Sequence, residues 1–423
     1  MSAETLPRAS RLRLSLLAAA MTFFCTVIVG RLVYYQVVLG DELRREAMVQ
    51  RTREREVATK RGYVVDSTGH LLALDVVEWE IAVSPSLVVD PVEASVALAQ
   101  LLELPKEQVY AWLISDRAWL RLATDVPYET GEAIVALDLS GIICTPHYRR
   151  FYPEGELVAH VTGIVNSTGD GFYGVEGYYN QVLKGVPGQQ TVEQSPAGVV
   201  LPMLPGEQTE ARPGSSVVLT LDRNIQYVAE QELARALDEY GAKAGTVVIM
   251  DPRRGAILAL ASSPHYDPNG FEQADIDLLM DPVVSKMWEP GSIFKIVTWA
   301  AGLDSGTISP GTTFYDNGAL EVGGRVIQNW DRQGHGLVTM TDGLIQSLNT
   351  VAAFTSTSMG KDTFYTYLRR FGFGTITGVD LASEGPGMVK LPGDSNWFPS
   401  DLGTNSFGQG VACLLYTSPS PRD

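Results

Sequence analysis

Residues 292–303 form an apolar run that constrains the fold more than any other stretch of the chain. Pro290 and Gly291 interrupt whatever precedes the run, and no further helix breaker occurs before Gly302. Apolar residues point in every direction around a helical wheel, which predicts a helix that is buried on all sides. The chain must therefore build a domain around this helix.

Lys295 is the only charged residue within this run. It lies one turn after Ser292, so both side chains share a face of the helix. Burial lowers the pKa of an ammonium group, and a lysine that can lose its proton can activate a neighbouring serine. The start of the helix adds backbone N–H groups and a positive dipole end, which suit a developing oxyanion. Ser292 is therefore the candidate nucleophile, and Lys295 is the candidate base.

The Ser-x-x-Lys spacing alone is a weak signal, because it occurs again at 358–361 with a glycine inside it. Ser292 gains support from Ser347-Leu348-Asn349, which is the only Ser-x-Asn in the chain. Ser-x-x-Lys, Ser-Asp-Asn and Lys-Thr-Gly together are the signature of penicillin-binding proteins and class A β-lactamases. Ser347 and Asn349 therefore join the candidate site.

Other stretches strengthen this resemblance. Residues 245–269 resemble the opening hairpin of a penicillin-binding transpeptidase domain, and 406–410 resemble a segment before the third motif. Residues 61–69 resemble the Arg-Gly-x-Ile-x-Asp-Arg-Asn-Gly signature of class B pedestal domains, with Ser67 and Thr68 departing from it. From about Arg61 to Gly410, the chain is identified as a member of the class B penicillin-binding proteins.

The resemblance implies a peptidoglycan D,D-transpeptidase that is the target of β-lactams. Lys295 would take the proton of Ser292, which attacks the D-Ala–D-Ala carbonyl of a stem peptide. Ser347 would pass a proton to the departing amine, and Asn349 would bind the substrate's backbone amide. The implied partners are peptidoglycan stem peptides, β-lactams, and a polytopic glycosyltransferase of the division or elongation machinery.

Two alternatives stay open. One is a membrane-bound β-lactam sensor or β-lactamase-like protein that shares the acylated serine but cross-links nothing. The other is a non-catalytic cell-wall scaffold. A further open point is the stretch that contains Trp330, Asp331 and His335, which lies either near the cleft or in a structural loop.

Residues 14–36 predict a transmembrane anchor, with 1–13 as a cytoplasmic tail. Arg31 would lie near the interface, where its side chain can reach water. A cleaved signal peptide is the alternative, but no A-x-A-like cleavage site follows the apolar run. The lysine and arginine counts on the two sides of the anchor favour an orientation with the bulk of the chain in the cytoplasm. Large domains cross the membrane regardless of such charges. The resemblance places the bulk outside the bacterial cytoplasmic membrane, and we follow the resemblance.

A net charge of -17 without a basic stripe argues against nucleic-acid binding. The three cysteines give no disulfide framework, and no group of His, Cys and carboxylates has metal-ligand spacing along the chain. We therefore expect no metal and no cofactor. His160 is expected to be a packed histidine.

The expected fold class is α+β. It comprises the anchor, an elongated α+β pedestal of the dimerisation type at 37–205, and a transpeptidase domain at 206–411 with helices around an antiparallel sheet. Asp222 can cap the helix that follows it, and Gly241 can end that helix. We further expect helices at 41–56, 92–102, 106–114 and 129–139, a strand at 215–221, and a hairpin formed by 246–250 and 256–261.

No Lys-Thr-Gly or Lys-Ser-Gly follows Asn349. In the family this motif lies on a strand that forms one wall of the cleft, so we expect the C-terminal part of the transpeptidase domain to be missing. Residues 412–423 break from the family and resemble translated sequencing adapter, which predicts a non-native tail. The chain as written is accordingly expected to be inactive, with no stable β-lactam acylation and a poorly cooperative melt.

Overall fold

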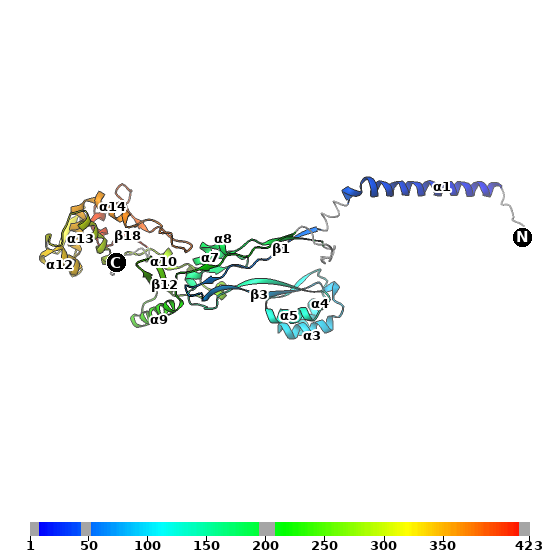
Figure 1. Ribbon diagram of the computed structural model, residues 1–423, viewed down its shortest axis with the longest axis horizontal. Helices are drawn as coiled ribbons and strands as arrows, with labels where there is room; N and C mark the ends of the chain where they lie inside the picture. Colours follow the sequence, from blue (N-terminus) through cyan, green and yellow to red (C-terminus); the bar gives the residue numbers. More distant parts are fainter. Residues whose placement is uncertain (1–7, 44–51, 194–207, 414–423) are drawn as a thin grey trace.

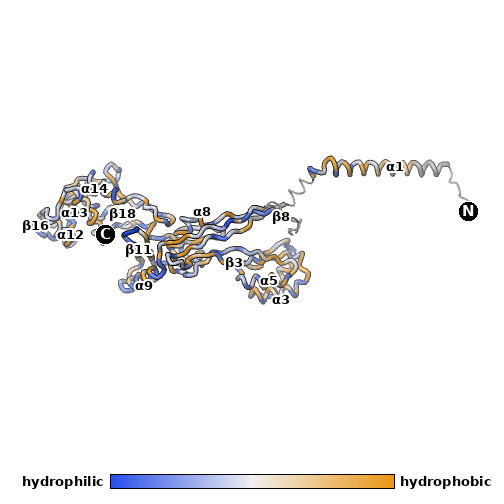
Figure 2. Tube along the Cα trace, in the orientation of Figure 1, coloured by the Kyte–Doolittle hydropathy of each residue, from blue (hydrophilic) through white to orange (hydrophobic). Residues whose placement is uncertain are grey.

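The structure is a computed structural model that describes residues 8–43, 52–193 and 208–413 (Figure 1). Its first helix, α1 (Arg8–Val33), continues into a π-helical turn at Tyr34–Val38. The stretch Leu16–Val38 has 23 residues, is apolar enough to cross a membrane, and is not buried against the rest of the protein. At 1.5 Å per residue it is about 35 Å long, which suffices for a hydrocarbon core of about 30 Å. Figure 2 shows the apolar character of α1.

The pedestal is built around one long strand, β3 (Leu71–Val83). Strands β4 (Leu120–Pro127) and β5 (Ile142–Phe151) pair antiparallel with it, one on each side. Near one end, apolar residues of β3 and β4 pack with those of three helices, which confirms the helices expected there. These helices are α3 (Pro91–Leu102), α4 (Lys106–Leu113) and α5 (Tyr128–Ala136).

The charged helix expected over 41–56 is wrong at 52–56, because Thr52–Val57 form strand β1, which pairs antiparallel with β8 (Gly188–Glu193). Residues 40–43 are helical, and 44–51 lie outside the described residues. Tertiary pairing overrides local helix propensity here, because every residue of β1 has a partner residue in β8.

The pedestal sheets also extend later in the chain than the boundary at residue 205 expected from the sequence. Strand β9 (Gln208–Thr209) pairs with β8, and β10 (Val217–Val218) pairs in parallel with β2 (Val64–Val65). The strand expected at 215–221 is therefore short, and it completes a pedestal sheet.

A buried ion-pair network holds the centre of the pedestal. Glu176, in α7 (Gly174–Tyr178), accepts hydrogen bonds from Arg61 Nε at 2.6 Å and Arg150 Nε at 2.7 Å. Arg150 Nη1 donates in turn to Asp75 at 2.9 Å. All four side chains are at most 7% exposed. The charges are mutually compensated, so the loss of one member leaves another uncompensated in the interior.

We therefore expect Glu176→Gln to lower the free energy of unfolding by about 3–5 kcal/mol, as is typical when one partner of a buried pair is removed. Urea unfolding of the purified protein in detergent, followed by circular dichroism, would measure the loss. The matched control is Glu80→Gln, because Glu80 pairs with Arg121 in a partly solvent-exposed ion pair that should contribute at most about 1 kcal/mol. Equal losses in both variants would contradict the structural role of Glu176.

The transpeptidase region begins with helix α9 (Arg223–Tyr240), as expected. The Asp222 side chain accepts from the backbone N–H groups of Asn224 and Ile225, and Gly241 ends the helix at a φ of 62°. Apolar residues of α9 pack on the antiparallel hairpin β11 (Gly245–Asp251) and β12 (Ala256–Ser263), which confirms that hairpin.

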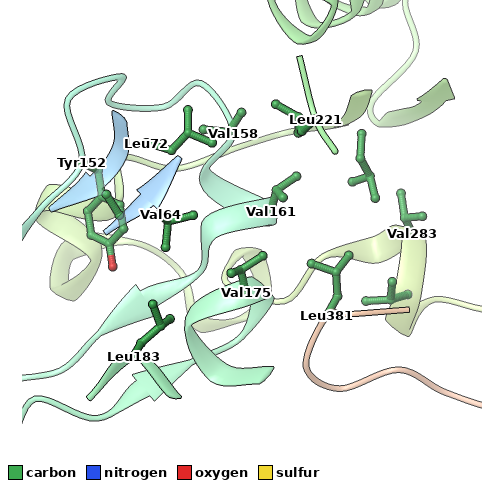
Figure 3. Packing of buried hydrophobic residues seen from close by; sticks show 13 residues of the cluster. Val64, Leu72, Tyr152, Val158, Val161, Val175, Leu183, Leu221, Val283 and Leu381 are labelled. Carbon is green, nitrogen blue, oxygen red and sulfur yellow. The ribbon is translucent and has the colours of Figure 1, made fainter. Parts of the chain in front are cut away.

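The pedestal and the transpeptidase region share one hydrophobic core. Val64, Leu72 and Val161 of the pedestal lie in the same buried cluster as Val283 and Leu381 (Figure 3). All five side chains are at most 6% exposed. Burial of apolar surface of this kind, at about 25 cal/mol per Å², holds the two regions against each other.

The apolar run of 292–303 does not form one uniform helix. It starts as a 3₁₀ turn at Gly291–Phe294 and continues as α11 (Lys295–Asp304). Its buried side packs against α13 (Asn349–Met359) and α14 (Lys361–Arg370). The expectation of burial on all sides is wrong, because the described elements cover only part of the circumference of this run. Three of its residues are at least 36% exposed: Ile293, Ile296 and Leu303.

The last described residues are packed. Strand β18 (Val411–Ala412) pairs antiparallel with β17 (Met388–Val389), and Cys413 is buried. Residues 414–423 of the tail expected at 412–423 lie outside the described residues.

Candidate active site

Ser292 and Lys295 lie on the same face of the 3₁₀ turn and the helix that follows it. The Nζ atom of Lys295 is 3.2 Å from Oγ of Ser292. The serine is exposed, whereas the lysine is 1% exposed and belongs to the largest fully buried side chains of the protein. An accessible hydroxyl therefore lies beside a buried amine, as the spacing predicted.

The loop between α12 (Met340–Ile345) and α13 brings the Ser-x-Asn motif to this amine. Lys295 Nζ donates to Ser347 O at 2.6 Å and lies 2.9 Å from Ser347 Oγ. It also donates to Asn349 Oδ1 at 2.8 Å. Between the two motif residues, Leu348 is fully buried in the core and anchors the loop. All four predicted site residues therefore meet at one atom.

Ser347 has a left-handed backbone conformation, with a φ of 55°. Residues other than glycine rarely adopt this conformation, which costs of order 1 kcal/mol or more and tends to occur at functional sites. The conformation places both the carbonyl oxygen and the hydroxyl of Ser347 near the amine.

Burial dominates the electrostatics of Lys295. It lowers the pKa of the amine from 10.5 to about 8. No ion pair to Lys295 occurs within the described residues, so hydrogen bonds alone offset the cost of its charge. With a pKa of about 8, roughly a tenth of the amine is neutral at pH 7, far more than for a solvated lysine.

The set of acceptors around the amine suits its neutral form. A neutral amine has two N–H donors and one lone pair. Ser347 O and Asn349 Oδ1 can only accept, so they occupy both donors. The lone pair is then left for a hydroxyl proton of Ser292 or Ser347. This arrangement can deprotonate a serine.

A second hydrogen-bonded cluster lies behind Asn349, and of its residues only His335 was a candidate from the sequence. Asp316 is 1% exposed and accepts from the side chains of Asn329, His335 and Thr350. No local pattern points to Asp316, because its partners lie 13, 19 and 34 residues later in the chain.

The stretch around Trp330 takes part in this cluster. Besides its contact with Asp316, His335 places Nε2 3.2 Å from Asp331. Trp330 itself is 77% exposed. Asp331 and His335 thus hold a loop in place, and Trp330 projects from that loop into solvent.

The segment 406–410 supports the turn that carries Ser292. Thr298 Oγ1 donates to Ser406 O at 2.7 Å, and the backbone N–H of Gly291 donates to Gly408 O at 3.2 Å. Gly408 has a φ of 75°, and a Cβ atom there would lie 2.3 Å from the carbonyl oxygen of Gly291. Only glycine fits this close approach.

Comparison with known proteins accounts for most of the chain. Residues 56–219 match the family described as the penicillin-binding protein dimerisation domain, and 245–420 match the penicillin-binding protein transpeptidase domain. These two domains in this order, with the Ser292 site in the second, assign the chain to one family. The chain belongs to the class B penicillin-binding proteins.

Similar proteins and a similar solved structure agree with this family assignment. Stage V sporulation protein D of Bacillus subtilis is 32% identical over 407 residues, which cover 95% of this chain and 62% of that protein. Peptidoglycan D,D-transpeptidase FtsI of Escherichia coli K12 is 28% identical over 94% of this chain and 68% of its own length. The crystal structure of a peptidoglycan synthetase from Bifidobacterium adolescentis has a TM-score of 0.68 at 26% identity, covering 87% of this chain and 71% of that one. The chain thus spans less than two thirds of the sporulation protein.

Among the described residues of the pedestal, one group of side chains has the types that bind metals, and the spacing along the sequence did not indicate it. Glu78, Asp125 and His147 lie on three adjacent strands, with ligand atoms within 4.8 Å of one another. Arg149 Nε already donates to Glu78 at 2.8 Å, and Asp125 is paired with His147. The group is therefore accounted for as a set of ion pairs.

His160 agrees with the expectation of a packed histidine. It is 4% exposed, its Nε2 atom lies 3.0 Å from the carbonyl oxygen of Leu278, and its ring packs edge-on against Tyr266. Burial lowers its pKa to about 4. The ring is thus neutral at physiological pH.

Proposed function

We propose that this protein is a membrane-anchored peptidoglycan D,D-transpeptidase that works through an acyl-serine intermediate. The observation that carries the proposal is the position of the Lys295 amine between the hydroxyls of Ser292 and Ser347, with Asn349 as its fixed acceptor. The names of the relatives support the same reaction class.

Acylation begins at the Ser292 hydroxyl. Its proton passes to the lone pair of Lys295 while Oγ forms a bond to the carbonyl carbon of the penultimate D-Ala of a stem peptide. The bond from that carbon to the terminal D-Ala nitrogen breaks. The departing amine receives the proton from Lys295 through the Ser347 hydroxyl, which lies 2.9 Å from Nζ. Asn349 holds the substrate's backbone amide through its carboxamide.

Deacylation reverses these proton movements. The amine of a neighbouring stem peptide loses a proton to the same relay and forms a bond to the acyl carbon. The bond to Ser292 Oγ then breaks, and the proton returns to the serine. The product is a cross-link. A β-lactam would acylate Ser292 in place of the stem peptide.

The proposed location follows from α1, which is long and apolar enough to anchor the protein in the bacterial cytoplasmic membrane with its bulk outside the cytoplasm. Peptidoglycan stem peptides would be the substrates. A polytopic glycosyltransferase of the division or elongation machinery would be the partner that supplies glycan strands.

The two other readings predict different chemistry. A β-lactam sensor or β-lactamase would share Ser292 and Lys295 but would form no peptide cross-link, and a scaffold would not be acylated at all. The pedestal, with its match to the dimerisation domain, favours the transpeptidase.

The test is an exchange assay with the full-length gene product in detergent. Given a D-Ala–D-Ala pentapeptide and a fluorescent D-amino acid, we expect the fluorescent residue to replace the terminal D-Ala, and penicillin to remain bound for hours. Rapid turnover of penicillin without exchange would favour a β-lactamase. The same assay on residues 1–423 alone should give neither product, because no Lys-Thr-Gly follows Asn349 and described strands β11 and β12 form a two-stranded sheet.

A further inference from the structure

Asp316 is placed to organise the loop and the helix start behind the active site. One carboxylate oxygen accepts from Gly318 N at 2.8 Å and Thr350 Oγ1 at 2.9 Å. The other accepts from Asn329 Nδ2 at 2.7 Å and lies 3.0 Å from Nδ1 of His335. Burial would raise the pKa of Asp316, but these hydrogen bonds outweigh it and lower the pKa. The group is therefore an ionised carboxylate that only accepts.

Two of these partners fix each other as well. Asn329 Oδ1 accepts from the backbone N–H of Thr350 at 3.2 Å, so Asp316 and Asn329 together hold both the backbone and the side chain of Thr350. The residues next to them are also bonded, because Asn349 Nδ2 donates to Gln328 O at 3.0 Å. The first turn of α13 is thus tied to β15 (Arg325–Gln328) and the residue after it, at Asn349 and at Thr350.

The orientation of Asn349 decides where the Lys295 lone pair points. With its Nδ2 bound to Gln328, the side chain can present only Oδ1 to the amine, at 2.8 Å. That contact occupies one of the two N–H groups of neutral Lys295, and Ser347 O occupies the other. If Asn349 moved, an N–H group could turn toward a serine hydroxyl, and the lone pair would no longer face it.

We propose that Asp316 is a positioning residue for acylation: through Asn329 and Thr350 it holds Asn349, and Asn349 directs the Lys295 lone pair to the serine hydroxyl. The inference rests on the proposed transpeptidase function. It assigns Asp316 no contact with substrate, and it gives the Asp316–Asn329 hydrogen bond a role in the reaction beyond folding.

The experiment measures the second-order rate constant for Ser292 acylation by a fluorescent penicillin, per folded molecule, in the full-length gene product. In Asp316→Asn an amide replaces the carboxylate, so its N–H group meets the N–H group of Asn329 where an oxygen had accepted. We expect the rate constant to fall about 10²-fold, which is the loss that a misplacement of about 1 Å can cause. The double variant Asp316→Asn with Asn329→Asp restores the pair with donor and acceptor exchanged. Its rate constant should be at least about ten-fold higher than that of Asp316→Asn alone.

Asp75→Asn is the matched control, because Asp75 is also a buried, ion-paired aspartate but lies in the pedestal. It should lower the melting temperature and leave acylation per folded molecule unchanged. If Asp316→Asn does not fold, Thr350→Val removes a single hydrogen bond to Asp316 and should slow acylation about ten-fold.

An acylation rate within two-fold of wild type in Asp316→Asn, or in Thr350→Val where the first variant does not fold, would overturn the inference. The absence of any recovery in the exchanged pair would do the same. Failure of the wild-type protein to label would instead refute the proposed function, so the two failures are distinguishable.

Discussion

Ser292→Ala is expected to abolish covalent labelling by a fluorescent penicillin in the full-length gene product. Its hydroxyl is the one that is both exposed and within 3.2 Å of the buried amine. Alanine removes the atom that would bond to the β-lactam carbonyl carbon, so no residual labelling by the same route is possible. Gel fluorescence after boiling in detergent would measure the covalent adduct.

The matched control is Ser358→Ala, in the second Ser-x-x-Lys of the chain. Ser358 is exposed, but Gly360 ends its helix with a φ of 77°, and Lys361 lies over the ring of Trp397. Labelling should therefore be unchanged in Ser358→Ala. Labelling that survives Ser292→Ala, or that disappears in Ser358→Ala alone, would refute the assignment of the nucleophile.

Lys295→Met is expected to slow acylation by about 10²–10⁴-fold, the range that general-base catalysis contributes. Methionine keeps much of the buried apolar volume and removes the amine. In the wild-type protein, the base works only when it is neutral. Because burial lowers its pKa to about 8, the acylation rate should rise with pH up to about 8 and then level off. Stopped-flow acylation from pH 6 to pH 10 would measure this profile.

The same pKa has a consequence for stability. Between about 8 and 10.5, the unfolded state holds a proton on Lys295 that the folded state has lost, so this group's contribution to the free energy of unfolding rises with pH across that window. Lys295→Met should remove this rise. Lys361→Met is the control for both measurements, because Lys361 is exposed. A flat rate profile in the wild type would count against Lys295 as the base.

Much of the site could be predicted because its signals are local. Lys295 lies three positions after Ser292, and helical geometry alone puts their side chains on one face. The Asp222 cap and the Gly241 terminus bound α9 by the same kind of short-range hydrogen bonding. An apolar run of sufficient length similarly predicts a membrane anchor from composition.

Tertiary structure decided what depends on segments far apart in the chain. Strand β1 exists because β8 pairs with it more than 130 residues later, and that pairing overrides the helical pattern expected there. The exposure of Ile293 and Ile296 likewise depends on which elements cover α11, whereas the helical wheel describes only the helix itself.

The active site shows the same division. The sequence by itself determined which residues are the candidates for the chemistry, since Ser292, Lys295, Ser347 and Asn349 stand in recognisable motifs. Only the fold decided that the amine meets acceptors 52 and 54 residues away, and that Asp316 holds Asn349 in place from behind. Hydrogen bonds depend on distance and direction in space, and a linear pattern specifies these only within a turn or two of the same element.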